Sequence, residues 1–342
     1  MPSKTFTEAV ASVTAASDPT DLFGHRTSDG SNGRHRYLAL VKLLHPDTVD
    51  AASSAAAHEV FAKLNRLWQD FRDDTHGTVS VGGSTYRLGR VPRHDDIAAC
   101  YPLHDDAGRS RVELRLARDP ADNDLIRAEA EALDRIAKQG DPRFKAYVPR
   151  PAATIRLRDK DTGTERCGNV LPRLHGFVSL RAVASSRPDG LDPRDVAWMW
   201  RRLLVALGHT HRAGIVHGAI LPEHVLIHPE EHGLILSNWY YAVAIGKPLS
   251  AVVERATAAY PREVFDRAPA QPSLDIAMAT TCMTDLIGAR IPDRLRDFAR
   301  GCAHTAPNRR PPDAWELLSE LDEILDRLWG PRKFRPFKMT VN

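Results

Sequence analysis

The sequence contains few cysteines, and they stand far apart along the chain. Cys100, Cys167, Cys282 and Cys302 include no pair at the short spacing that structural zinc sites use. A chain of 342 residues can also bury a core large enough to fold without a disulfide or a metal. We therefore expect four reduced, buried thiols and no metal site.

Long apolar runs are missing as well. No stretch approaches the roughly 20 apolar residues of a membrane-spanning helix, and residues 1–17 lack the basic-then-apolar layout of a secretory leader. The 47 basic residues nearly balance the 44 acidic ones, which leaves a net charge of only +3. These absences predict a cytoplasmic protein that has neither a membrane nor a nucleic acid as its partner.

What is present, 42% hydrophobic and 27% charged residues, is typical of a soluble globular protein with two or three domains. Apolar spacing changes from helical to alternating and back along the chain, which predicts the α+β class. The expected parts are a flexible N-terminus at 1–20, a small helical unit at 21–75, a strand-rich part at 76–175, a mainly helical part at 176–330 and a basic tail at 331–342. For this tail we favour a solvated segment over a docking segment.

The small helical unit carries two apolar stripes. The first stripe follows the spacing i, i+3, i+4 and i+7 and consists of Tyr37, Leu40, Val41 and Leu44. The second has similar helical spacing and consists of Val60, Phe61, Leu64, Leu67, Trp68 and Phe71. Between them, His45-Pro46-Asp47 ends the first helix, because a helix usually stops before the residue that precedes a proline. Two such stripes joined by a loop predict a helical hairpin.

Roughly residues 20–72 resemble the J domain of the Hsp70 co-chaperones. The resemblance rests on the segments RHRYLALVKLLHPDT and AHEVFAKLNRLWQDF. In that family a basic helix and the His-Pro-Asp loop dock on an Hsp70-type chaperone and stimulate its ATP hydrolysis. The resemblance implies Hsp70-binding roles for His45, Pro46, Asp47, Arg34, Arg36 and Lys42. A helical hairpin that merely retains these letters is the alternative, because the tripeptide by itself is a weak motif.

A second resemblance begins at HTHRAGIVHGAILPEHVLIHPEEHGLILSNW, which is similar to the catalytic loop and metal-binding segment of eukaryotic-type serine/threonine protein kinases. His217 matches the histidine of the family's His-Arg-Asp motif, but Ala219 stands in place of the general-base aspartate. His224 replaces the metal-binding asparagine of the loop, and Asn238 replaces the metal-binding aspartate that follows it.

The strand-rich part continues this resemblance. Arg115, in VELRLA, stands where the family has its phosphate-binding lysine, and Glu129 matches the helix glutamate that pairs with that lysine. The expected glycine-rich loop falls near GRVPRHDDIAACYPL, which has lost its pattern of glycines. Tyr240 replaces a glycine, so we expect the cleft to be partly filled.

Residues that hold the kinase fold together are better kept. Glu263 matches the carboxylate at the end of the activation segment, and Arg310 matches the arginine that pairs with it. Asp275 matches the aspartate of the central helix. The resemblance covers roughly residues 80–328 and implies a bilobal fold, in which a β-rich N-lobe precedes a helical C-lobe.

These replacements imply a catalytically dead kinase-like domain, or pseudokinase. A positioned general base contributes roughly 10²–10⁴-fold to rate, and Mg²⁺ prefers carboxylate oxygen to amide or imidazole. The chain is therefore not expected to be an enzyme and needs no cofactor, although ATP without a metal stays open.

The leading interpretation is an adaptor that recruits and stimulates an Hsp70 while its kinase-like domain binds an unknown client protein or regulates the J-like unit. The first alternative is an atypical active kinase, or another nucleotide-dependent transferase that uses a rearranged cleft. The second alternative is a structural protein in which both modules are relics. Metal-dependent stabilisation by ATP distinguishes the enzyme from the adaptor.

Overall fold

A computed structural model of the protein describes residues 5–16, 18–24, 31–45, 54–72, 78–89, 92–158 and 163–339. Pro46 and Asp47 of the predicted motif lie outside the described residues. The chain forms two compact units: Met1–Pro92 with Tyr101–Ser110, and Arg93–Cys100 with Arg111–Asn342. Strand β4 (Ala98–His104) contributes residues to both units.

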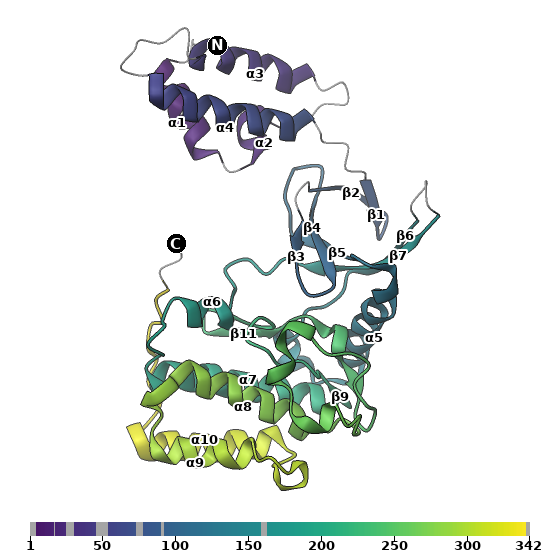
Figure 1. Ribbon diagram of the computed structural model, residues 1–342, viewed down its shortest axis with the longest axis vertical. Helices are drawn as coiled ribbons and strands as arrows, with labels where there is room; N and C mark the ends of the chain where they lie inside the picture. The colour runs from purple at the N-terminus through teal and green to yellow at the C-terminus, as the bar shows by residue number, and fades with distance from the viewer. Residues whose placement is uncertain are drawn as a thin grey trace. The chain divides into compact units, whose positions relative to one another are not determined.

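Among its described residues, the first unit contains four helices (Figure 1): α1 (Phe6–Ala15), α2 (Pro19–Phe23), α3 (Ser31–Leu44) and α4 (Ser54–Arg72). Helices α3 and α4 pack together, and both predicted apolar stripes face the shared core. Tyr37 stacks on Trp68 with ring centroids 4.4 Å apart. Gly33 permits this close packing, because a Cβ atom there would collide with the Phe71 ring.

The N-terminal segment corrects one expectation. Residues 1–20 are expected to be flexible, but α1 is a capped helix that packs on α3 and α4. The Thr5 side chain accepts a hydrogen bond from the Glu8 N–H, and the Glu8 carboxylate accepts one from the Thr5 N–H. Ala9 and Val13 are fully buried. The small residues of this segment carry a weak hydrophobic signal in the sequence, although they fit closely against the other helices.

The first unit also contains an antiparallel hairpin of β1 (Thr78–Val81) and β2 (Ser84–Leu88). Its turn uses Gly82 and Gly83, both at positive φ, which glycine adopts without strain. Strand β2 continues the ladder onto the C-terminal part of β4, where Leu88 lies opposite Leu103.

The second unit begins with an antiparallel sheet and a helix that packs on it. The elements are β3 (Arg93–His94), the start of β4, β5 (Val112–Ala117), α5 (Asn123–Gln139), β6 (Ala153–Arg158) and β7 (Glu165–Pro172). Strand β3 pairs with β4, while β7 lies between β5 and β6. Helix α5 buries one apolar face, which includes Ile126 and Leu133, against this sheet.

The rest of the second unit is mainly helical. Its elements are β8 (Val178–Ser179), α6 (Leu180–Ser185), α7 (Pro193–Arg212), β9 (Ile215–Val216), β10 (Val225–His228), β11 (Gly233–Leu236), β12 (Val243–Ala244), α8 (Pro272–Ile287), α9 (Asp293–Cys302) and α10 (Ala314–Trp329). Helix α7 packs between α8 and α10, and α9 packs on α8. Long runs of buried residues in α7 and α8 place the main core here.

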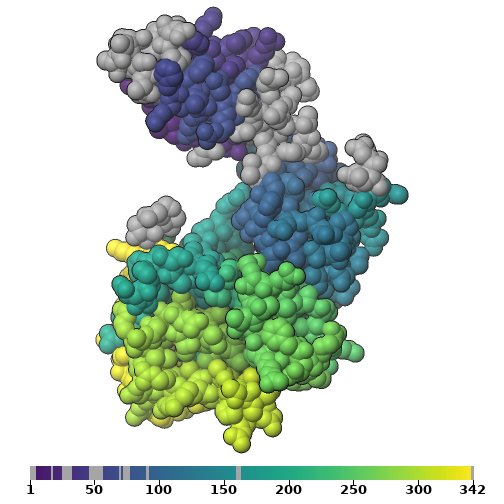
Figure 2. All heavy atoms as spheres, in the orientation of Figure 1, coloured from purple at the N-terminus to yellow at the C-terminus, as the bar shows by residue number. Residues whose placement is uncertain are grey.

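The C-terminal segment corrects a second expectation, because residues 331–339 are not a solvated tail. Phe337 is buried, with its ring 6.1 Å from that of Trp198. Arg335 Nε donates to Asp195 of α7 at 3.0 Å, and Arg187 Nη2 donates to the Lys338 carbonyl at 3.3 Å. In Figure 2 this yellow segment lies against the teal surface near α6. The basic composition of this segment does not indicate that Phe337 is buried. Nor does it indicate that Arg335 pairs with an acidic residue of the distant helix α7.

The four cysteines are buried and unpaired, as expected. Burial raises the pKa of the Cys282 and Cys302 thiols to about 12, so both stay protonated at neutral pH. Within the described ranges, no helix combines the length and the apolar character needed to cross a membrane.

Candidate functional site

The first part of the candidate site is a buried ion pair between the sheet and α5. Arg115 of β5 lies 3.7 Å from Glu129 of α5, measured from Nη1 to Oε1. The Arg115 Nε also donates to Glu113 at 2.9 Å, and its Nη1 donates to the Asn238 amide oxygen at 3.4 Å. The structure therefore brings together three of the residues predicted from the sequence, Arg115, Glu129 and Asn238.

Glu129 is enclosed by hydrogen-bond donors. It accepts from Asn169 Nδ2 at 3.0 Å and from the Trp239 N–H at 3.2 Å. Burial raises the pKa of Glu129, against the opposing pull of the Arg115 guanidinium. The carboxylate ties α5, β7 and the segment after β11 into one framework.

His217 and Asp275 anchor the loop that resembles the kinase catalytic loop. Asp275 of α8 accepts hydrogen bonds from the N–H groups of His217 and Gly218, at 2.8 and 2.9 Å. The His217 Nε2 lies 2.9 Å from the Ser237 carbonyl oxygen. Burial lowers the pKa of His217 to about 4, so the ring is neutral at physiological pH and serves to hold the loop.

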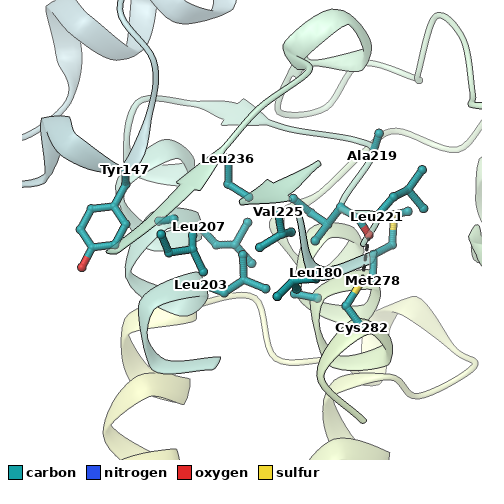
Figure 3. Close-up of a cluster of buried hydrophobic side chains, with 14 of the residues drawn as sticks. Tyr147, Leu180, Leu203, Leu207, Ala219, Leu221, Val225, Leu236, Met278 and Cys282 are labelled. Carbon is teal, nitrogen blue, oxygen red and sulfur yellow. Dashed lines mark hydrogen bonds between the residues drawn. The ribbon is translucent and has the colours of Figure 1, made fainter. Parts of the chain in front are cut away.

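The loop itself has become part of the hydrophobic core. Ala219 and Leu221 are buried, and Figure 3 shows them in the same cluster as Leu180, Met278 and Cys282. By the resemblance to kinases, Ala219 stands at the general-base position and Leu221 at that of a nearby lysine. Both are apolar side chains packed in the core.

His224 is fully buried, and both of its ring nitrogens have partners. Nδ1 lies 2.8 Å from the Ala219 carbonyl oxygen, and Nε2 lies 2.7 Å from Asp96 Oδ2. Asp96 also forms an ion pair with Arg255 and accepts from the Tyr241 hydroxyl at 3.4 Å. A metal ion at this position would have to compete with Asp96 for the imidazole.

The pKa of Asp96 reflects these contacts. Burial raises it, but the hydrogen bond and attraction of His224, followed by those of Arg255, outweigh burial and lower it to about 2. The carboxylate is therefore ionised throughout the physiological pH range.

Asp95, the neighbour of Asp96, forms a second link. Its Oδ2 accepts a hydrogen bond from the Tyr240 hydroxyl at 2.9 Å, and its Oδ1 accepts from the N–H of Ala98 at 2.8 Å. Tyr240, at the position where the resemblance to kinases has a glycine, is almost completely buried. Asp95 and Asp96, between β3 and β4, thus occupy the place of the expected glycine-rich loop.

The sequence predicted none of the roles of Asp95, Asp96 and Arg255. Adjacent acids are common in turns, so the Asp95-Asp96 pair by itself indicates no more than a turn. A usable signal was that this pair stands where the resemblance predicts phosphate-binding glycines. A cavity of about 450 Å³ remains beside the two carboxylates, and its lining includes Arg115, Arg173 and Asn238.

The structural pair predicted from the sequence is formed. Arg310 makes an ion pair with Glu263, and its Nη2 donates to Glu263 Oε2 at 3.3 Å. Its Nε also donates to the His304 carbonyl at 2.6 Å. This pair holds the segment after β12 against the helices, as Asp275 holds the loop after β9.

The predicted Hsp70-binding residues lie in the first unit. Arg34, Arg36 and Lys42 are exposed on α3. His45 follows that helix directly, is half-buried, and its ring lies edge-on to Phe61 with centroids 5.2 Å apart. The exposed cations therefore lie on α3, and the imidazole of His45 lies at the C-terminal end of that helix.

No protein-family model matches the chain. Among solved structures, the chain is similar to the BubR1 kinase domain, with 14% identity and a TM-score of 0.57 over 74% of this chain and 83% of that one. It is also similar to vaccinia related kinase 3, with 15% identity and a TM-score of 0.56 over 74% of this chain and 91% of that one. At this identity the similarity shows the fold, so the chain contains a protein-kinase-like fold.

Proposed function

We propose that this protein is an adaptor whose kinase-like part binds or regulates without transferring phosphate, and whose N-terminal helical unit recruits an Hsp70-type chaperone. The observation that carries the first half is the pairing of Asp96 with His224 inside the cleft. The protein's own carboxylate neutralises a position at which the family binds a metal.

Three features support a cleft without phosphoryl transfer. Ala219 supplies no general base, a group that contributes roughly 10²–10⁴-fold where it is present. His224 and Asn238 offer imidazole and amide where Mg²⁺ prefers carboxylate oxygen. Asp95 and Asp96 place negative charge where the triphosphate of a nucleotide would have to lie.

A thermal-shift titration tests this half of the proposal. Wild-type protein is titrated with ATP alone, with ATP and Mg²⁺, and with ATP and Mn²⁺, and transfer of radiolabel from the γ-phosphate is followed in parallel. We expect no metal-dependent stabilisation and no labelled product. Labelled product that disappears in an Asn238→Ala variant would establish the alternative, an atypical kinase or transferase.

The formed Arg115–Glu129 pair favours a second, weaker candidate function, which is nucleotide binding without a metal. Stabilisation by ATP that is unchanged by EDTA and reduced in Arg115→Ala would support it. In that case the nucleotide acts as a regulatory ligand, because the base is still missing.

The Hsp70-recruiting half rests on α3 and the residue after it. Exposed Arg34, Arg36 and Lys42 present positive charge, which steers association with an acidic partner surface. His45 directly follows this cationic helix, as the resemblance to J domains requires. The client of the kinase-like part is a further protein.

An ATPase assay with a cognate Hsp70 tests this half. Wild-type protein is expected to raise steady-state ATP hydrolysis, and His45→Gln to abolish the increase while circular dichroism stays unchanged. His58→Gln on α4 is the matched control, because it makes the same chemical change on an exposed residue of the same unit. Equal stimulation by His45→Gln and wild type would remove the chaperone role.

A further inference from the structure

A cavity of about 900 Å³ lies on the helical part, among residues of α7, α10 and the segment that follows α10. Its lining shares no residue with the kinase-like cleft. The volume falls in the range of small-molecule sites, which is about 300–1,000 Å³. None of the functions proposed above uses it.

Aromatic rings form one wall of this cavity. Trp198 of α7 stacks on His232, with centroids 4.2 Å apart and planes 8° apart. Phe334 lies 4.6 Å from the His232 ring and is 69% exposed. Burial lowers the pKa of His232, so a neutral imidazole stands between the two apolar rings. A flat apolar group fits against such a wall.

Positive charge lines the rim. Five cations and two carboxylates contribute to the lining: Arg194, Arg201, Arg332, Lys333, Arg335, Asp322 and Asp326. Arg201 pairs with Asp322 at 2.9 Å, and Arg335 pairs with Asp195 at 3.0 Å. Within the described part of the chain, Arg332 and Lys333 form no ion pair with a carboxylate. The rim is therefore able to bind an anion.

Two buried polar atoms of the aromatic wall lack partners. Among the described residues, Trp198 Nε1 and His232 Nε2 form no hydrogen bond, although both side chains are more than nine-tenths buried. An unsatisfied buried group costs about 1–3 kcal/mol, and native proteins contain few of them. The two unpartnered atoms are explained if a ligand completes the site.

We propose that this cavity binds a small organic anion with a flat aromatic body. The ring of the ligand packs against Trp198, His232 and Phe334, and a polar atom of the ligand accepts from Trp198 Nε1. Its carboxylate or phosphate is held by Arg332 and Lys333. Because Phe334 and both cations belong to residues 331–339, binding also holds this segment against α7.

Calorimetric titration of the full chain with naphthoate tests the proposal, with naphthamide as the uncharged analogue of the same shape. We expect saturable binding of naphthoate at one site. Naphthamide should bind about tenfold more weakly, a difference of about 1.4 kcal/mol, because it lacks the charge. Added salt should weaken the binding of naphthoate and leave the binding of naphthamide unchanged.

Three variants locate the site. We expect each of three variants to bind naphthoate about tenfold more weakly. They are the double variant Arg332→Ala/Lys333→Ala and the single variants Phe334→Ala and Trp198→Phe. Lys145→Ala with Arg150→Ala is the control for the first variant, since it removes the same two charge types from exposed positions outside the lining. The proposal fails if wild type shows no saturable binding, or if the Arg332/Lys333 variant and this control bind equally well.

Discussion

At the scale of single residues, the kinase-like cleft shows how a replaced functional group acquires a structural role. His224 stands where the resemblance to kinases places a metal ligand, and both of its ring nitrogens are used by Ala219 and Asp96. Asn238 no longer offers a carboxylate, and its amide oxygen accepts from Arg115. Each replacement therefore contributes to stability in the cleft rather than leaving an unsatisfied group.

Replacing Asp96 by Asn should lower the free energy of unfolding at pH 7 by about 1–2 kcal/mol, after allowance for the half-exposed Arg255. The carboxylate has a pKa of about 2 when folded and 3.8 in the reference state, so its contribution is present above pH 4. It is lost as the pH falls towards 2. Urea unfolding of Asp96→Asn, with Asp106→Asn as an exposed control, measures both effects. Equal losses in the two variants would contradict the role of Asp96.

His217 should make stability depend on pH. Its pKa is about 4 when folded and 6.5 in the reference state, so the unfolded chain binds the extra proton between these values. The free energy of unfolding therefore rises with pH from about 4 to 6.5, and this residue contributes up to about 3 kcal/mol. His217→Gln should flatten that rise in urea unfolding across this pH range, whereas exposed His94→Gln should not. A rise of equal slope in His217→Gln would contradict the assignment.

At the scale of elements, sequence patterns predict two segments least well, namely α1 and residues 331–339. Helix α1 has a small-residue face, and residues 331–339 have a basic composition. In both cases only a few positions are buried, and periodicity over so few positions gives little signal. The contacts that order these ends come from distant helices.

A matched pair of substitutions tests the packing of α1. Ala9→Asp places a carboxylate in a fully buried position, and Ala11→Asp makes the same change on the exposed face. We expect Ala9→Asp to destabilise the helical unit by about 3 kcal/mol or more, because the charge has no partner there. Ala11→Asp should cost less than about 0.5 kcal/mol. Thermal unfolding followed by circular dichroism measures the difference, and equal midpoints would show that α1 does not pack.

Phe337 and Phe334 offer a similar comparison in the C-terminal segment. Phe337→Ala should lower the free energy of unfolding by about 3 kcal/mol, since the ring is buried beside Trp198. Phe334→Ala removes a mostly exposed ring and should cost less than about 0.5 kcal/mol. Denaturant unfolding of both variants provides the measurement. A small loss in Phe337→Ala would mean that the segment is solvated, as its composition first indicated.

At the scale of the whole molecule, a protein-kinase-like fold is kept while the chemistry of its cleft is changed. Asp275, Glu263, Arg310 and the Arg115–Glu129 pair retain the contacts that connect its elements. By contrast, the positions that the resemblance assigns to the base and the metal ligands carry other residues, namely Ala219, His224 and Asn238. A fold is a scaffold that does not by itself determine function, so the proposed adaptor role rests on these site residues rather than on the fold.

Restoring the three lost residues together should not restore catalysis. A variant with Ala219→Asp, His224→Asn and Asn238→Asp still has Asp95 and Asp96 in the cleft, and Tyr240 beneath them. We expect no transfer of γ-phosphate radiolabel, because positioning and charge neutralisation act as one unit. The further change Asp96→Gly is the comparison variant. Transfer by the triple variant alone would show that the two aspartates do not block the site.

The sequence by itself determined which side chains stand where the resemblance to kinases places the base and the metal ligands, and where the long amphipathic helices lie. These are properties of single positions or of spacing within one element. Only the tertiary structure decided that Asp96 meets His224, 128 positions away, and that Tyr240 donates to Asp95. The same holds for the burial of α1 and of Phe337. Such contacts depend on how distant segments pack together, which the spacing of residues within one element does not reveal.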